Sequence, residues 1–198
     1  MTVYHMSQTL VLGENMKNDF EKKAEYTLPF VHALEIGMDF FCDVAANGQA
    51  KKLLPDQLIH LDRSEYIKWC VEGVFEFVRK EEFPNCPSRI NCKYFFDDLE
   101  NFKILYEAGW KQEPEEKRAK LHLYEIELDE EPLQKFDMCI YDKAYDAMAQ
   151  KQDIAAVLSC ARRYFSKAQS ETPIWEIMSD RPAKAVKDIS SFLKGLEE

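Results

Sequence analysis

Cysteines and histidines are the side chains of this 198-residue chain that could hold a metal ion or serve as nucleophiles, and there are six cysteines and four histidines. Cys86 and Cys92 form a C-x5-C pair, and no CxxC or HxxxH pair accompanies them, so the zinc signal is weak. His32, His60 and His122 share no spacing with acidic residues or cysteines that would suggest a metal site. We therefore expect no bound metal.

Phosphate-binding and hydrolase motifs are also missing from the sequence. Six glycines are scattered singly, which excludes a Gly-x-Gly-x-x-Gly loop, a P-loop and a Gly-x-Ser-x-Gly elbow. No HExxH is present, and no cysteine has the local context of a Cys–His hydrolase, although that class stays open. Cys70 lies on an apolar helical pattern, and we expect most of the cysteines to be buried thiols rather than disulfides.

Charge and composition narrow the class of protein. The 26 basic residues against 36 acidic ones give a net charge of −10, which argues against broad binding to nucleic acids. No apolar run of about 18 residues exists, so we expect no membrane span. The first residues lack a basic stretch followed by an apolar core, so we expect no secretory signal and a cytoplasmic location.

Helices and strands predicted in the first half of the chain would position its functional side chains. The spacing of apolar residues, with glycine and proline marking the ends of elements, predicts a strand, two helices, a second strand and a third helix. Pro29 is expected in the first turn of the first helix, Ser64 as the N-cap of the second, and Asp97-Asp98 as the cap of the third. The predicted ranges, in order, are Val3–Met6 with a possible extension to Leu12, Pro29–Ala46, Ser64–Lys80, Arg89–Phe96 and Leu99–Gly109.

The second half alternates between charged, strand-like and helical stretches. We expect a loop, two strands, a helical region, a short strand and a closing helix, over Lys111–Lys120, Leu121–Leu128, Phe136–Tyr141, Lys143–Lys167, Ile174–Met178 and Ala183–Leu196. No linker separates the helical first half from the strand-rich middle. The sequence therefore predicts one α+β domain over residues 1–198, with a mainly helical insertion at about 14–83.

Three blocks of residues, taken in order, go beyond this fold class. The first is Tyr4-His5 in the opening strand. The second is Pro87-Ser88-Arg89, followed by the strand to Phe96, the acidic cap and an amphipathic helix. The third is Glu176, which lies on a late strand between Trp175 and Ile177. Together they resemble the ADP-ribosyltransferase-like superfamily, in an uncharacterised bacterial branch that would be a domain of unknown function.

That resemblance implies a split pair of antiparallel β-sheets with helices packed on them, and NAD+ as substrate in the cleft between. Glu176 would be catalytic, because a carboxylate beside the ribose can stabilise the oxocarbenium-like transition state of nicotinamide release. His5 would hydrogen-bond the adenosine-side ribose and Arg89 would meet the pyrophosphate. Tyr94, or else Phe95, would stack on the nicotinamide ring.

Alternatives remain for each of these residues and for the function. Glu125 and Glu127, on the strand predicted at Leu121–Leu128, could replace Glu176 as the key carboxylate. The position two residues before Glu176 is Ile174, so the acidic pair of arginine-modifying members is missing. Arg89 could instead be a surface ion-pair partner, and the aromatic residues could be core. The protein is thus either an enzyme that cleaves NAD+ and transfers ADP-ribose to an unassigned acceptor, or a non-catalytic α+β binding or interaction module.

Overall fold

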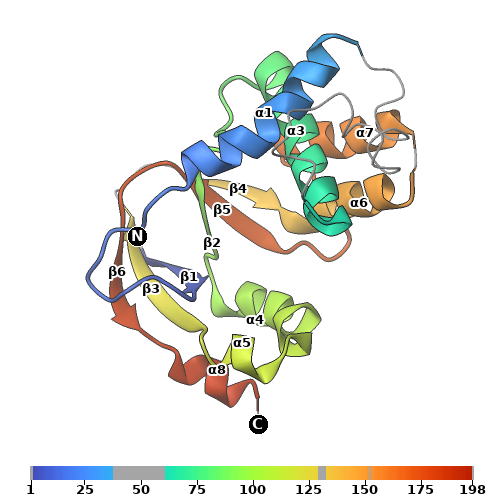
Figure 1. Ribbon diagram of the computed structural model, residues 1–198. Coiled ribbons are helices and arrows are strands. Elements are labelled where there is room, and N and C mark those ends of the chain that lie inside the picture. Colours follow the sequence, from blue (N-terminus) through green and yellow to red (C-terminus); the bar gives the residue numbers. More distant parts are fainter. Residues whose placement is uncertain (1, 38–60, 129–132, 152, 198) are drawn as a thin grey trace. The chain divides into compact units, whose positions relative to one another are not determined.

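A computed structural model describes residues 2–37, 61–128, 133–151 and 153–197 (Figure 1). The chain divides into two compact units. The sheet unit comprises Met1–Asn18, Cys92–Lys135 and Ile174–Glu198, and the helical unit comprises Asp19–Asn91 and Phe136–Pro173. The mixture of helices with two small antiparallel sheets confirms the predicted α+β class. The predicted organisation as one domain with an insertion stays a prediction.

The first sheet of the sheet unit has three antiparallel strands in the order β1-β3-β6, which are Thr2–Ser7, His122–Leu128 and Ala183–Asp188. In its register His5 lies opposite Tyr124, and Tyr124 lies opposite Asp188. The strands predicted at Val3–Met6 and Leu121–Leu128 are therefore confirmed.

The second sheet has the order β2-β5-β4, with strands Lys93–Phe95, Trp175–Ser179 and Gln134–Asp137. Its strands β2 and β5 pair antiparallel. Strand β2 covers only the last part of the strand predicted at Arg89–Phe96, whereas β5 confirms the one predicted at Ile174–Met178.

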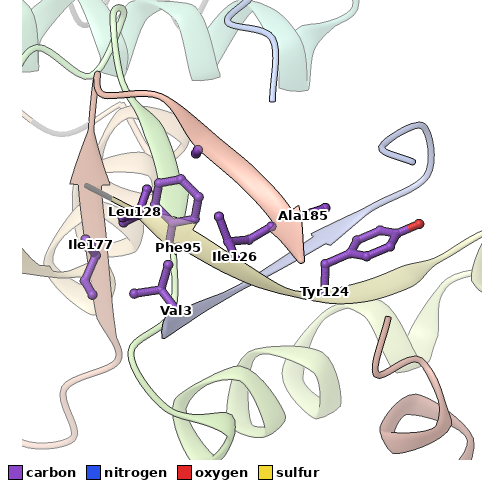
Figure 2. Packing of buried hydrophobic residues seen from close by; sticks show 8 residues of the cluster. Val3, Phe95, Tyr124, Ile126, Leu128, Ile177 and Ala185 are labelled. Atoms are coloured by element: carbon purple, nitrogen blue, oxygen red, sulfur yellow. The ribbon is translucent and has the colours of Figure 1, made fainter. Parts of the chain in front are cut away.

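Both faces of the first sheet are covered by apolar side chains, because successive residues of a strand point to opposite faces. On one face lies the buried cluster of Figure 2, made of Val3, Phe95, Tyr124, Ile126, Leu128, Ile177, Ala183 and Ala185. A second cluster around Leu121, Leu123, Phe102, Tyr106 and Leu193 packs strand β3 against helices. The helices of this unit are α4, η3, α5 and α8, over Leu99–Ala108, Trp110–Gln112, Glu115–Arg118 and Ser191–Gly195.

The helical unit contains α1, α3, α6 and α7, which are Phe20–Glu35, Arg63–Glu82, Met138–Ala149 and Ile154–Phe165 (Figure 1). Helix α3 carries the predicted apolar stripe, and all of its members are buried: Ile67, Cys70, Val71, Val74, Phe75 and Val78. Burial of this stripe, rather than helix propensity, supplies most of the stabilisation of such a helix. Among the described helices, none is both long enough and apolar enough to cross a membrane.

Helix caps follow short polar side chains, as expected, but not always the predicted one. Asp62 caps α3 by accepting a hydrogen bond from the Glu65 N–H at 2.9 Å, so the predicted cap Ser64 is wrong. Asp98 caps α4 by accepting from the Asn101 N–H at 2.7 Å, as predicted. A carboxylate at such a position satisfies an amide that has no partner inside the helix.

The helix predicted to start at Pro29 begins earlier, at Phe20, and Pro29 lies inside it. A proline there forfeits one backbone hydrogen bond. Packing offsets that loss, because α1 buries Phe30 and Val31 and approaches α3 closely at Gly73. Helix α1 ends at Glu35, and residues 38–46 of the predicted helix lie outside the described part of the chain.

Four further elements differ from the sequence-based expectation. Ala183–Asp188 is strand β6 rather than the start of a helix, because Ala183 and Ala185 face the core and alternate with the exposed Lys184 and Val186. The charged stretch Lys111–Lys120 contains η3 and α5 instead of a plain loop. Most of the strand predicted at Phe136–Tyr141 is helical instead, because β4 ends at Asp137, which caps α6 by accepting from the Cys139 N–H. The predicted helical region Lys143–Lys167 is divided between α6 and α7.

Candidate functional site

Three neighbouring strands of the sheet unit carry His5, Tyr94, Phe95 and Glu176. Strands β1 and β2 are bridged between Tyr4 and Phe96, whose backbone N–H groups each donate to the other's carbonyl at 2.8 and 2.9 Å. Strand β2 in turn pairs with β5, which holds Glu176. Residues far apart in sequence are thus placed on adjacent strands of one unit.

His5 is held by a backbone contact that fixes its tautomer. Its Nδ1 lies 2.9 Å from the carbonyl oxygen of Tyr94, and because a carbonyl only accepts, Nδ1 carries the proton. Burial lowers the pKa of the imidazole below 6.5, against the opposing effect of this hydrogen bond. The ring is therefore neutral at pH 7 with Nε2 as an acceptor. No hydrogen-bond partner of Nε2 is found among the described residues.

Strand parity separates the two aromatic candidates. Phe95 lies opposite Ile177 and is fully buried in the apolar cluster, where Figure 2 shows its ring close to Val3 and Leu128. The His5 and Phe95 rings also meet in a T-shaped contact, with centroids 5.9 Å apart, so His5 lies on the Phe95 side of β2. Tyr94 points to the opposite face of β2 and is only half-buried. Of the two rings, Tyr94 is therefore the one partly accessible to a ligand.

Glu176 shares a face with Tyr94. Tyr94 lies opposite Met178, and Glu176 is two residues before Met178, so the two side chains are diagonal neighbours about 7–8 Å apart across the ladder. The Glu176 side chain is 4 % exposed, so it does not lie on a solvated strand face. A charge developing beside such a carboxylate would be weakly screened by water.

The alternative carboxylates lie on β3 of the other sheet. Glu125 accepts a hydrogen bond from Lys187 Nζ at 2.7 Å, so its charge is paired across the strands. Glu127 is exposed. Neither lies on the β2–β5 ladder that carries Tyr94 and Glu176.

Arg89 belongs to the helical unit and is 6 % exposed there. Its Nε and Nη2 donate to the two oxygens of Glu72 at 3.0 and 3.2 Å, and Nη1 donates to the Tyr164 hydroxyl at 2.5 Å. The guanidinium also lies 4.2 Å from the centre of the Tyr141 ring. These contacts within the helical unit account for the burial of the Arg89 guanidinium without a ligand.

Sequence reasoning missed a second polar cluster, which lines a cavity of the sheet unit. Asp188 Oδ1 accepts hydrogen bonds from the backbone N–H and the hydroxyl of Ser190, and these bonds, together with His122, hold the pKa of the carboxyl below its ordinary value. Nδ1 of His122 lies 3.6 Å from Asp188 Oδ2 and 3.5 Å from Ser190 Oγ. The only signal in the sequence was the short Asp-x-Ser spacing, which is typical of a turn.

This Ser190–His122–Asp188 cluster is not a catalytic triad. In a triad the imidazole uses one nitrogen for the serine and the other for the carboxylate. Here the same nitrogen faces both groups, and Ser190 donates its proton directly to Asp188. The serine therefore has no base positioned to activate it.

The described part of the chain was searched for metal-binding groups and disulfides. It holds no group of three or more histidine, cysteine or acidic side chains that could bind a metal ion. None of its five cysteines forms a disulfide, and Cys70 and Cys92 are buried. Cys42 and His60 lie outside the described residues.

Comparison with known proteins gives a family without an assigned activity. A search of curated proteins finds no match. A family model described as a protein of unknown function (DUF2441) matches residues 3–191, nearly the whole chain. The expected domain of unknown function is confirmed, whereas nothing in the match links it to ADP-ribosyltransferases. The chain belongs to the DUF2441 family.

Proposed function

We propose that the sheet unit binds NAD+ and cleaves its nicotinamide–ribose bond, transferring the ADP-ribose to an acceptor or to water. The observation that carries this proposal is the shared face of Tyr94 and Glu176 on the β2–β5 ladder. His5 lies on the adjacent strand β1, with its ring on the Phe95 side. Two small antiparallel sheets are also what the resemblance to ADP-ribosyltransferase-like proteins implies.

In this proposal His5 binds a ribose hydroxyl. A hydroxyl needs an acceptor for its proton, and the neutral imidazole with its proton on Nδ1 offers Nε2 for that role. The Tyr94 carbonyl holds the ring in one orientation, which lowers the entropy lost when a ligand binds. The partly accessible Tyr94 ring is the candidate to stack on nicotinamide.

Glu176 would act on the reacting bond. Loss of nicotinamide leaves positive charge on the ribose, as glycoside cleavage does, and a nearby carboxylate stabilises that charge. The low exposure of Glu176 strengthens such an interaction, because little water screens it. The proposal leaves out a pyrophosphate contact from Arg89, whose donors are occupied by Glu72 and Tyr164.

A second candidate function is a non-catalytic binding module of the same fold. The same low exposure of Glu176, 4 %, favours it, because a catalytic carboxylate has to reach its substrate. The two functions differ in whether bound NAD+ is turned over, so one pair of measurements separates them.

The test compares the wild type with Glu176→Gln for NAD+ binding by calorimetry and for nicotinamide release. The amide keeps the shape of the side chain and removes the charge. Glu125→Gln and Glu127→Gln are the matched controls, since they remove carboxylates of the neighbouring sheet. Far-UV circular dichroism checks that each variant is folded.

The proposal expects binding by all four proteins and release that is lost only in Glu176→Gln. Release lost in Glu125→Gln or Glu127→Gln instead would move the catalytic role to that carboxylate. Binding without release in the wild type would support the binding module. No binding by the wild type would overturn both NAD+ functions.

A further inference from the structure

A cavity of about 610 Å³ lies within the sheet unit, between α4, α5, α8 and the ends of β3 and β6. Figure 1 shows these three short helices grouped beside the C-terminus. The volume is in the range of sites for small organic ligands, about 300–1,000 Å³. All of its walls belong to one unit, so the cavity is defined without reference to the helical unit.

Several charged groups that line the cavity already have partners among the lining residues. On one side Arg118 Nε lies 3.2 Å from Glu197 Oε1, which also accepts the Tyr106 hydroxyl at 2.7 Å. On the other side Asp188 is bonded to Ser190 and faces His122. A charged ligand would have to compete with these partners for each group, so the cavity favours a neutral one.

Hydrogen-bonding capacity nevertheless remains on both sides. Arg118 Nε is buried without a hydrogen bond, since its contact with Glu197 has ion-pair distance but not hydrogen-bond geometry. Among the described residues, Arg118 Nη2, Glu197 Oε2 and the Ser191 hydroxyl have no hydrogen-bond partner. The cavity thus presents donors and acceptors close together, above an apolar floor of Leu121 and Leu193.

A hydroxyl group both donates and accepts, so neighbouring hydroxyls can bond to an arginine and a carboxylate at the same time. The C–H faces of a sugar ring suit an apolar floor. We propose that this cavity binds a neutral sugar through vicinal hydroxyls, from either a free saccharide or the ribose of a nucleoside. The inference is independent of the proposed NAD+ chemistry at Glu176.

The test is a titration of the ¹⁵N-labelled full chain, followed by NMR, with maltose, ribose and adenosine as neutral probes and ribose 5-phosphate as a charged one. We expect saturating shifts of the Leu123, Ser190 and Ser191 amides with at least one neutral probe. That affinity should not change between about 0.01 and 1 M salt, over which the screening length falls from about 30 to 3 Å. Maltose binding would identify a saccharide source, and adenosine binding a nucleoside source.

Two variants test the contacts. Glu197→Gln, which removes the charge of the accepting carboxylate, should weaken binding roughly tenfold, the loss expected for one hydrogen bond to a charged group. Ser191→Ala, at an exposed position, should weaken it without affecting folding. The matched control is Asp180→Asn, an exposed carboxylate of the same unit outside the cavity, which should leave the affinity unchanged.

Three results would overturn the inference. The first is the absence of saturating shifts with all three neutral probes. The second is tighter and salt-sensitive binding of ribose 5-phosphate. The third is an equal loss of affinity in Glu197→Gln and Asp180→Asn.

Discussion

Replacing Arg89 by leucine tests whether this arginine stabilises the helical unit. Arg89 and Glu72 are 6 % and 8 % exposed, and the two hydrogen bonds between them are 3.0 and 3.2 Å long. Two unit charges about 4 Å apart attract by about 4 kcal/mol at an effective dielectric constant of about 20. Leucine removes that attraction and leaves the Glu72 carboxylate buried without its cation. We therefore expect Arg89→Leu to lower the free energy of unfolding by about 3–5 kcal/mol.

The double variant Glu72→Leu/Arg89→Leu distinguishes the unpaired charge from lost packing. It removes both charges, and replacing a whole buried pair by apolar side chains is often close to neutral. We expect it to be more stable than Arg89→Leu alone. Arg163→Leu is the matched control, because Arg163 is exposed on α7 and its guanidinium makes a long 3.5 Å contact with the Gln169 carbonyl. Its effect should stay within about 0.5 kcal/mol.

Urea unfolding followed by circular dichroism measures these differences, with the slope m checked to be unchanged. The reasoning is refuted by an Arg89→Leu protein within about 1 kcal/mol of the wild type. The single variant Glu72→Leu completes the cycle. The reasoning is equally refuted by a double variant whose loss equals the sum of the Arg89→Leu and Glu72→Leu losses, since this would show no coupling between the side chains.

Three further changes probe the packing of α1 on α3, the cap of α4 and the state of His5. In Gly73→Ala the new Cβ would lie 2.5 Å from Phe30 Cβ, so we expect a loss of about 1–3 kcal/mol and a lower thermal midpoint, and an unchanged midpoint would contradict the close helix contact. Asp98→Ala removes the acceptor of the Asn101 N–H and should cost about 1 kcal/mol in urea unfolding, whereas no loss would show that the cap is not needed. The pKa of His5 is lowered in the folded chain, so the unfolded chain takes up a proton at His5 as the pH falls through 6.5 while the folded chain does not. The contribution of the neutral His5 side chain to stability is therefore complete above pH 6.5 and is lost below it. Between pH 7 and 5 the wild type should therefore lose stability more steeply than His5→Asn, by at most about 1.4 kcal/mol per pH unit, and parallel curves would refute a buried neutral His5.

Local patterns in the sequence were sufficient for some elements. The apolar stripe from Ile67 to Val78 has the period of a helix, and α3 buries every member of it. The short acceptor Asp98 before an amphipathic stretch located the start of α4. Such signals depend only on residues within a few positions of one another.

Other elements depend on contacts that no local pattern contains. Ala183–Asp188 is rich in alanine and lysine, which favour helices, yet it is a strand because it pairs with β3 and buries two alanines. Pro29 is tolerated within α1 because that helix packs on α3. Burial against distant segments decided both cases.

For the candidate site, too, the sequence suggested residues and the tertiary structure decided how they lie. The resemblance of three sequence blocks to ADP-ribosyltransferase-like proteins nominated His5, Arg89, Tyr94, Phe95 and Glu176. Only the tertiary structure decided that the His5 ring is bonded to a carbonyl 89 residues away, that Arg89 pairs with Glu72, and that Tyr94 rather than Phe95 shares a face with Glu176. Strand register and burial set these relations, and both arise from pairings between segments that are far apart in the chain.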